Sequence, residues 1–195
     1  MRNAVPDVIA FFRNMFTVVL ALALTEAFKQ FVSDRGEAQT RFIHWDRLPS
    51  LLTLLFLVIP FFHGMSRYFF NKYIASLPTP YAWPLMVDSI VFVSESALFF
   101  IMSRCMASIQ WRQFYTTVVA LLILDSLWAF YAITPGTWMW LNFTLGPILL
   151  IAVVTYWCLN KVPSLPMAFL FTGLIVVRTV LDYVWEWKFY FPDPM

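Results

Sequence analysis

Five ionisable side chains stand within long apolar stretches of this sequence, where lipid or protein interior would surround them. They are Asp88, Glu95, Asp125, Arg178 and Asp182. Placing one such group against lipid costs roughly 2.5–3.5 kcal/mol on insertion scales. We therefore expect these residues to face one another or water, and we predict that they form a proton or cation pathway, or a polar core that responds to the state of the membrane.

Acids outnumber bases in this set. The four carboxyl groups face one deeply placed cation, Arg178, and His63 is the other base nearby. Burial and neighbouring anions both disfavour an ionised carboxylate. At least one acid is therefore expected to hold a proton, or a cation or water must enter. The alternative is structural: buried Arg–Asp pairs and lone acids also hold helices together.

Helical spacing groups several of these residues. Asp88 and Glu95 are seven positions apart, so they share one face of a helix. A serine stripe repeats at the same interval beside them, at Ser89, Ser96 and Ser103. Small hydroxyl residues favour close helix packing with hydrogen bonds between helices. We predict a packing seam there, either inside the bundle or between subunits.

Two further contacts are expected from local spacing. Arg178 can pair with Asp182, four residues later on the same helix. His63 follows Pro60 and precedes Gly64 at an expected kink. It is interpreted either as a structural histidine or as a peripheral proton relay.

The elements that carry these residues are transmembrane helices. The 195-residue chain is 61% hydrophobic and 12% charged, with a mean hydropathy of +0.73. That is more apolar surface than a soluble core of this length can hide. Six apolar stretches reach the roughly 20 residues that a spanning helix needs: 8–30, 48–70, 83–104, 113–134, 138–159 and 166–188. The first has a short apolar centre, and an interfacial helix is the alternative there.

The predicted fold is thus an all-α integral membrane protein, one polytopic domain over residues 1–195 with no soluble domain. A slight excess of cations in the first, third and fifth connections places those connections in the cytoplasm and both termini outside. The 33–47 connection is predicted to dock a cytosolic protein. Its candidate docking residues are Arg35, Arg41, His44, Trp45 and Arg47.

Several function classes are excluded by missing residues. No lysine lies in a predicted hydrocarbon core to hold retinal, and the two histidines are not paired within spans as haem ligands. The sequence has no HExxH or GxSxG motif, and no selectivity-filter motif resembling TVGYG. We expect no cofactor and no metal. A net charge of +2 without long basic runs argues against a nucleic-acid partner.

The leading hypothesis is a non-enzymatic multi-pass subunit, homo-oligomeric, in the cell membrane of a bacterium (the inner membrane). Its buried ionisable cluster would serve as a proton or cation pathway, or as a membrane-state sensor coupled to a cytosolic partner. A small proton-coupled transporter is the second hypothesis, although five glycines and no internal repeat count against it. The third is a lipid-modifying enzyme that uses Asp182 or Glu186 as acid or base.

Overall fold

Six long helices make up nearly all of the computed structural model, which describes residues 4–35, 40–75, 83–132 and 137–192. The long helices are α1 (Ala4–Phe31), α2 (Leu48–Phe69), α3 (Trp83–Arg104), α4 (Trp111–Ala132), α5 (Thr137–Cys158) and α6 (Leu165–Trp185). Short helices are η2 (Trp45–Arg47), the π-helical turn η3 (Phe70–Ala75), η4 (Ser108–Gln110) and α7 (Trp187–Tyr190).

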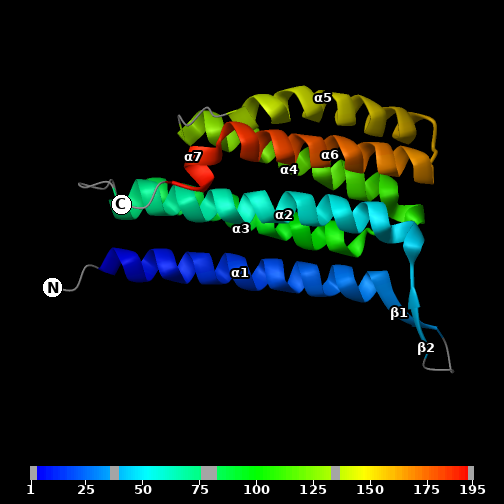
Figure 1. Ribbon diagram of the computed structural model, residues 1–195, viewed down its shortest axis with the longest axis horizontal. Coiled ribbons are helices and arrows are strands. Elements are labelled where there is room, and N and C mark those ends of the chain that lie inside the picture. The colour runs from blue at the N-terminus through cyan, green and yellow to red at the C-terminus, as the bar shows by residue number, and fades with distance from the viewer. Residues whose placement is uncertain (1–3, 36–39, 76–82, 133–136, 193–195) are drawn as a thin grey trace.

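The long helices run side by side and alternate in direction, so that both termini lie at the same end of the bundle (Figure 1). We call this the terminal end. Helix α1 packs along α3, α3 along α4, α4 along α5, and α6 packs on α2 and α5. An even number of alternating helices explains why the termini share an end, as the sequence predicted. The membrane side that this end faces stays a prediction.

The helix boundaries follow local sequence signals. Pro49 and Pro166 occupy first-turn positions of α2 and α6, where the missing N–H group costs nothing. Helix α6 ends at Trp185, three residues before the predicted end at 188, because Glu186 leaves the helical region with φ −101° and ψ 27°. That bend turns the chain into α7, whose Tyr190 is buried.

One short β-hairpin interrupts the helical fold. Strands β1 (Val32–Arg35) and β2 (Thr40–Ile43) pair antiparallel, with Val32 opposite Ile43 and Arg35 opposite Thr40. This hairpin lies in the connection that the sequence analysis treated only as a docking segment, so strictly the described chain is not all-α. Residues 36–39 of that connection lie outside the described residues.

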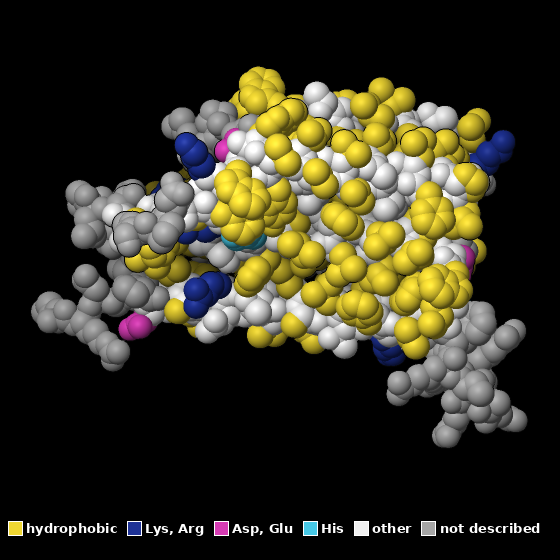
Figure 2. All heavy atoms as spheres, in the orientation of Figure 1, with side chains coloured by type: hydrophobic (Ala, Val, Ile, Leu, Met, Phe, Trp, Pro, Cys, Tyr) yellow, Lys and Arg dark blue, Asp and Glu magenta, His cyan; other side chains and the backbone are white. Residues whose placement is uncertain are grey.

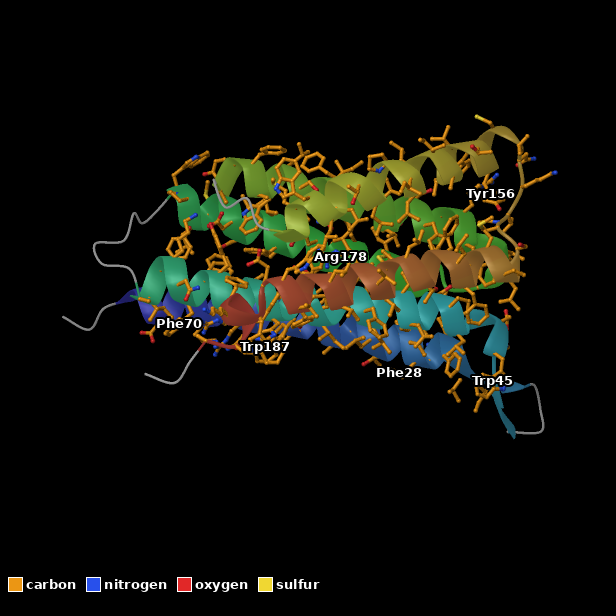
Figure 3. All side chains as sticks on the ribbon, turned by 45° about the horizontal axis from the view of Figure 1, so that its top comes forward. Phe28, Trp45, Phe70, Tyr156, Arg178 and Trp187 are labelled. Atoms are coloured by element: carbon orange, nitrogen blue, oxygen red, sulfur yellow. The ribbon has the colours of Figure 1, made fainter. Side chains whose placement is uncertain are left out.

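The outer surface is apolar along the flanks of the bundle, and charged side chains gather toward its ends (Figure 2). Phe28, Trp45 and Trp187 lie at outer faces, whereas Arg178 lies between the ribbons (Figure 3). Six helices are long and apolar enough to cross a membrane. Buried acids inside and exposed apolar side chains outside are the arrangement expected of a multi-pass membrane protein.

The first segment is a continuous 28-residue helix. Phe16 of α1 packs edge-to-face on Phe92 of α3, with ring centroids 6.4 Å apart. Because α1 lies alongside α3 rather than across an end of the bundle (Figure 1), the packing favours a sixth spanning helix over the interfacial alternative.

Candidate functional site

A chain of polar side chains crosses the interior from α4 to α7. Asn142 on α5 donates to a carboxylate oxygen of Asp125 on α4 at 2.6 Å, and its own carbonyl oxygen accepts from Nε of Arg178 at 3.1 Å. Arg178 Nη1 lies 3.5 Å from Oδ2 of Asp182, which confirms the predicted pair within α6. Tyr190 on α7 donates to the same oxygen at 2.9 Å. Four helices thus meet through one connected set of buried groups.

Tyr190 is fixed in its role as a donor. Burial and the adjacent Asp182 carboxylate hold the pKa of the Tyr190 hydroxyl well above its usual range, with burial the larger cause. The phenol therefore stays protonated at neutral pH. Gly64 of α2 makes room for it, because a Cβ atom at Gly64 would already lie 3.7 Å from the Tyr190 hydroxyl oxygen.

A cavity of about 280 Å³ lies beside this chain of contacts. Its walls combine acidic groups with aromatic rings from α2, α3, α4, α6 and the α7 segment. The charged lining residues are Asp125, Arg178, Asp182 and Glu186, and the aromatic ones are Phe61, Tyr68, Phe92, Trp128, Phe189 and Tyr190. The site is therefore an amphipathic pocket rather than a purely apolar gap.

Formal charges make this pocket acidic. Three carboxyl groups line it against the single guanidinium of Arg178, which is already engaged by Asp182 and Asn142. Asp182 is 1% exposed, and its second oxygen, Oδ1, has no hydrogen-bond partner among the described residues. A buried acceptor without a partner costs about 1–3 kcal/mol. The wall of the pocket therefore contains a buried acceptor that no described donor compensates.

Glu95 is a separate case. It is fully buried on α3, and neither carboxyl oxygen has a hydrogen-bond partner in the part of the chain that the structure describes. It does not line the cavity, but Asp125, which does, is close enough to act on it electrostatically. The predicted excess of carboxyl groups over basic groups is clearest at Glu95, because no described group donates a hydrogen bond to it.

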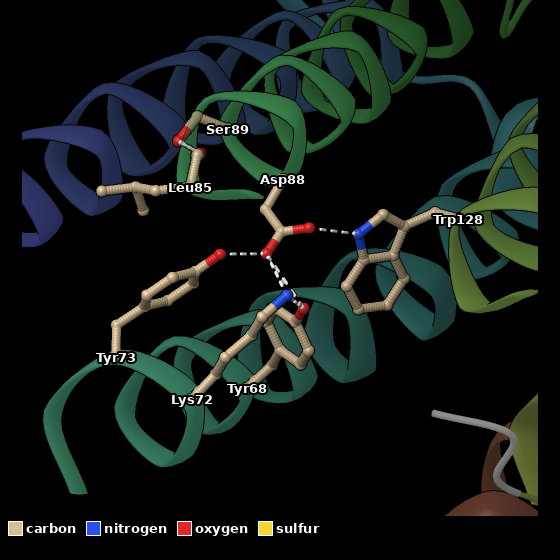
Figure 4. A network of polar contacts seen from close by, with 7 residues as sticks. All are labelled: Tyr68, Lys72, Tyr73, Leu85, Asp88, Ser89 and Trp128. Carbon is tan, nitrogen blue, oxygen red and sulfur yellow. Dashed lines mark hydrogen bonds and ion pairs between the residues drawn. The ribbon is translucent and has the colours of Figure 1, made fainter. Parts of the chain in front are cut away.

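Asp88 corrects the expected charge count. Its carboxylate is fully buried and bound by Nζ of Lys72 at 2.9 Å, by Tyr68 and Tyr73 at 2.9 and 2.6 Å, and by the Trp128 indole at 3.0 Å (Figure 4). Lys72 lies at a helix end and was therefore not predicted to be among the deeply placed charges. The π-helical turn η3 places it beside the first turns of α3, and its long side chain reaches inward.

The Asp88 cluster also shapes the cavity. Tyr68 and Trp128 bind Asp88 and line the cavity at the same time, with ring centroids 4.7 Å apart at 77°. Tyr68 also accepts a hydrogen bond from Lys72. A fully satisfied carboxylate of this kind is a structural anchor rather than a site poised to exchange a proton.

The serine stripe lies inside the bundle. Ser89, Ser96 and Ser103 are all buried within the single chain, on the helix that α1 packs along. Of the two predicted places for the seam, the structure thus favours the interior over a subunit contact. The prediction of hydrogen bonds between helices is wrong, because each serine hydroxyl donates to a carbonyl of its own helix, at 2.6–2.7 Å.

His63 lies apart from the acids. Its Nδ1 is 3.3 Å from the Tyr183 hydroxyl, and its ring packs on Tyr190 and Phe191 with centroids 5.0 and 5.3 Å away. The residue does not line the cavity. His63 thus belongs to an aromatic cluster that seats the α7 segment.

The predicted docking segment lies at the end opposite the terminal end. Trp45 is 64% exposed and packs edge-to-face on Phe31. His44 lies 3.9 Å from Asp46, and Arg47 is committed to α1 through the backbone oxygen and side chain of Gln30. Arg35 and Arg41 lie on the paired strands, and their side chains lie outside the described residues.

Several residues of the site were not predicted from the sequence, including Tyr68 and Tyr73 beside Asp88 and four others. Asn142 carries no charge, Lys72 and Trp128 were assigned to helix ends or left unplaced, and Tyr190 lies beyond the predicted last span. A neutral amide inside an otherwise apolar helix was a usable signal for Asn142. Among the described residues, no group of three or more His, Cys, Asp or Glu side chains is arranged to hold a metal ion.

Comparison with known proteins gives no relative from which a function can be carried over. No family model, curated protein or solved structure matches this chain.

Proposed function

We propose that this protein is a multi-pass membrane protein that binds a small organic cation in the cavity between α2, α4 and α6. The observation that supports the proposal is that carboxyl groups and aromatic rings line the same pocket. Cationic groups are attracted both to carboxylates and to aromatic faces, and the second attraction is strongest where water is excluded. Such a site prefers a ligand with a positive head and an apolar body.

The charges argue against an anionic ligand. Arg178, the one basic side chain that lines the cavity in the described part of the chain, is already bound to Asp182 and Asn142. An anion would have to break that pair and would then meet Asp125 and Glu186. A cation in the cavity would instead lie beside the carboxyl groups of Asp125, Asp182 and Glu186.

A binding pocket inside one chain bears on the earlier hypotheses. It favours the sensor and transporter classes, which need a ligand site, over a conducting pathway built from several subunits. The lipid-modifying enzyme gains less support, because Asp182 is engaged by Arg178 and Tyr190. Three earlier predictions are independent of cation binding and remain predictions. They are homo-oligomer formation, a cytosolic partner at 33–47 and location in a bacterial inner membrane.

The experiment measures binding of benzyltrimethylammonium to the full chain in lipid nanodiscs by calorimetry. Phenylacetate serves as the charge-reversed probe. We expect the cation to bind and phenylacetate to bind at least about tenfold more weakly, a difference of about 1.4 kcal/mol. No binding of the cation, or tighter binding of phenylacetate, would contradict the proposal.

Variants locate the site. Asp182→Asn and Asp125→Asn should each weaken binding of the cation about tenfold or more, because each removes a charge from the wall. Asp46→Asn is the matched control, since Asp46 is exposed and far from the cavity. Equal affinity in all three variants would place the ligand elsewhere. Export of the cation from proteoliposomes under a pH gradient would identify a carrier, and binding without movement a sensor.

A further inference from the structure

Glu95 is a buried acid of the helices that the contacts described so far leave without a role. Asp88, Asp125 and Asp182 each accept at least one hydrogen bond, whereas both oxygens of Glu95 have no partner in the described parts of the chain. Its exposed fraction is 0%. An ionised carboxylate there would lose its hydration with nothing in its place, a cost of several kcal/mol.

The position of Glu95 links it to the cavity without exposing it to a ligand. Phe92, one turn earlier on α3, lines the cavity wall, and Asp125 lines the cavity and acts on Glu95 electrostatically. Asp125 thus interacts both with the cavity that it lines and with Glu95. A positive charge placed in the cavity would be felt at Glu95 through Asp125.

Other charged groups on the elements around α3 lie elsewhere. Helix α1 carries Asp7 and Arg13 toward one end and Glu26 and Lys29 toward the other. Helix α2 carries His63 and Arg67 near η3, and η3 carries Lys72 beside Asp88. Helix α4 carries Arg112 at its start. His63 faces Tyr183 and Tyr190 instead of α3. Asp125 is the charged neighbour that acts on Glu95, in addition to the larger effect of burial.

We infer that Glu95 holds an exchangeable proton, which leaves when a cation binds in the cavity. This inference rests on the proposed function. The O–H bond of the Glu95 acid breaks, the electron pair stays on the carboxylate, and the proton goes to bulk water. The ligand's charge replaces the proton's charge, so the interior keeps its net charge. Two ionised carboxylates side by side are unfavourable in a buried site, and a nearby cation removes that penalty.

The test counts protons released on binding. Benzyltrimethylammonium has no titratable proton, so calorimetry in two buffers of different ionisation enthalpy reports protons that leave the protein. Wild type should release about one proton per ligand at a pH where Glu95 is protonated, and its affinity should rise up to about tenfold per pH unit. Glu95→Gln keeps the shape of the side chain without the proton. It should bind the cation with close to zero release and little pH dependence.

Glu26→Gln is the matched control, because Glu26 lies on α1 and is bonded to Gln30 of its own helix. It should release protons as wild type does. Cation binding with unchanged release in Glu95→Gln would overturn the inference alone and leave the binding function standing. Absence of any cation binding in wild type would overturn both, and equal release in wild type and all variants would assign the proton to Asp125 or another wall residue.

Discussion

The side-chain amide nitrogen of Asn142 lies 2.6 Å from a carboxylate oxygen of Asp125 on the neighbouring helix. The same amide accepts from Arg178 through its oxygen. Chemistry fixes its orientation, because a carboxylate accepts only from the NH₂ side and a guanidinium donates only to the oxygen. One neutral residue therefore orders an acid on α4 and a base on α6.

Replacing Asn142 by leucine should destabilise the bundle. Leucine has a similar volume but leaves Asp125 without the donor it has in Asn142 and leaves Arg178 with Asp182 alone. An unsatisfied buried polar group costs about 1–3 kcal/mol, and more when it is charged. Unfolding in mixed detergent measures the change in free energy. Thr144→Val on the same helix is the control, since Thr144 is exposed and its hydroxyl bonds only to its own helix. It should change the free energy by under about 0.5 kcal/mol. Equal effects of the two substitutions would contradict the bridging role.

The Asp88 cluster makes a second prediction. Asp88→Asn removes the counter-charge of Lys72 and one full acceptor from Tyr68 and Tyr73, and breaking a buried pair in this way costs about 3–5 kcal/mol. Because Lys72 keeps 25% of its side-chain surface exposed, we expect the lower end of that range.

A double-mutant cycle isolates the pair. Lys72→Met should destabilise wild type clearly but cost much less in the Asp88→Asn background, with a coupling of about 0.5–3 kcal/mol. Purely additive effects would show that Lys72 and Asp88 do not act as a unit.

Long apolar runs made the helices predictable. Each of the six predicted spans overlaps one long helix, because a lipid-exposed backbone must satisfy its own hydrogen bonds. The Arg178–Asp182 pair was equally accessible, since residues four apart on a helix are neighbours.

Contacts between helices were not predictable in the same way. Lys72 and Asp88 are 16 residues apart across a chain reversal, and Asn142 and Arg178 are 36 apart. Spacing says nothing about such pairs, because they depend on which helix faces meet. The cavity has the same origin: its walls come from five segments, and the rotation of each about its own axis is set by packing.

Gly64 gives a third prediction, on the shape of the cavity. Alanine should be tolerated there, since its Cβ would meet the Tyr190 hydroxyl and ring at ordinary contact distances of 3.7 and 3.9 Å. Leucine should displace Tyr190, break its bond to Asp182 and weaken binding of benzyltrimethylammonium about tenfold or more. Calorimetry compares the three proteins. Full affinity in Gly64→Leu would show that Tyr190 does not shape the site.

The two cysteines make a fourth prediction. Burial raises the pKa of the Cys105 thiol, with Arg104 opposing this more weakly, whereas Cys158 is exposed. Because the thiolate is the reactive form, purified Cys158→Ser should react with a maleimide at pH 7 about tenfold more slowly than Cys105→Ser. A raised pKa means that the Cys105 rate should still be climbing about tenfold per pH unit above pH 7. A faster reaction at Cys105 would contradict its burial.

The orientation of the bundle is the fifth prediction. The bias of cations toward the first, third and fifth connections places the end that carries Lys161 in the cytoplasm and the terminal end, with Lys188, outside. Lys161→Cys and Lys188→Cys, each made in a chain lacking both native cysteines, expose a thiol at opposite ends, because both lysines are exposed in the structure. A membrane-impermeant maleimide applied to intact cells should label Lys188→Cys directly and Lys161→Cys only after the membrane is permeabilised. The reverse pattern would invert the orientation, and it would open the Asp182 pocket toward the cytoplasm because the α7 segment that borders it lies at the terminal end.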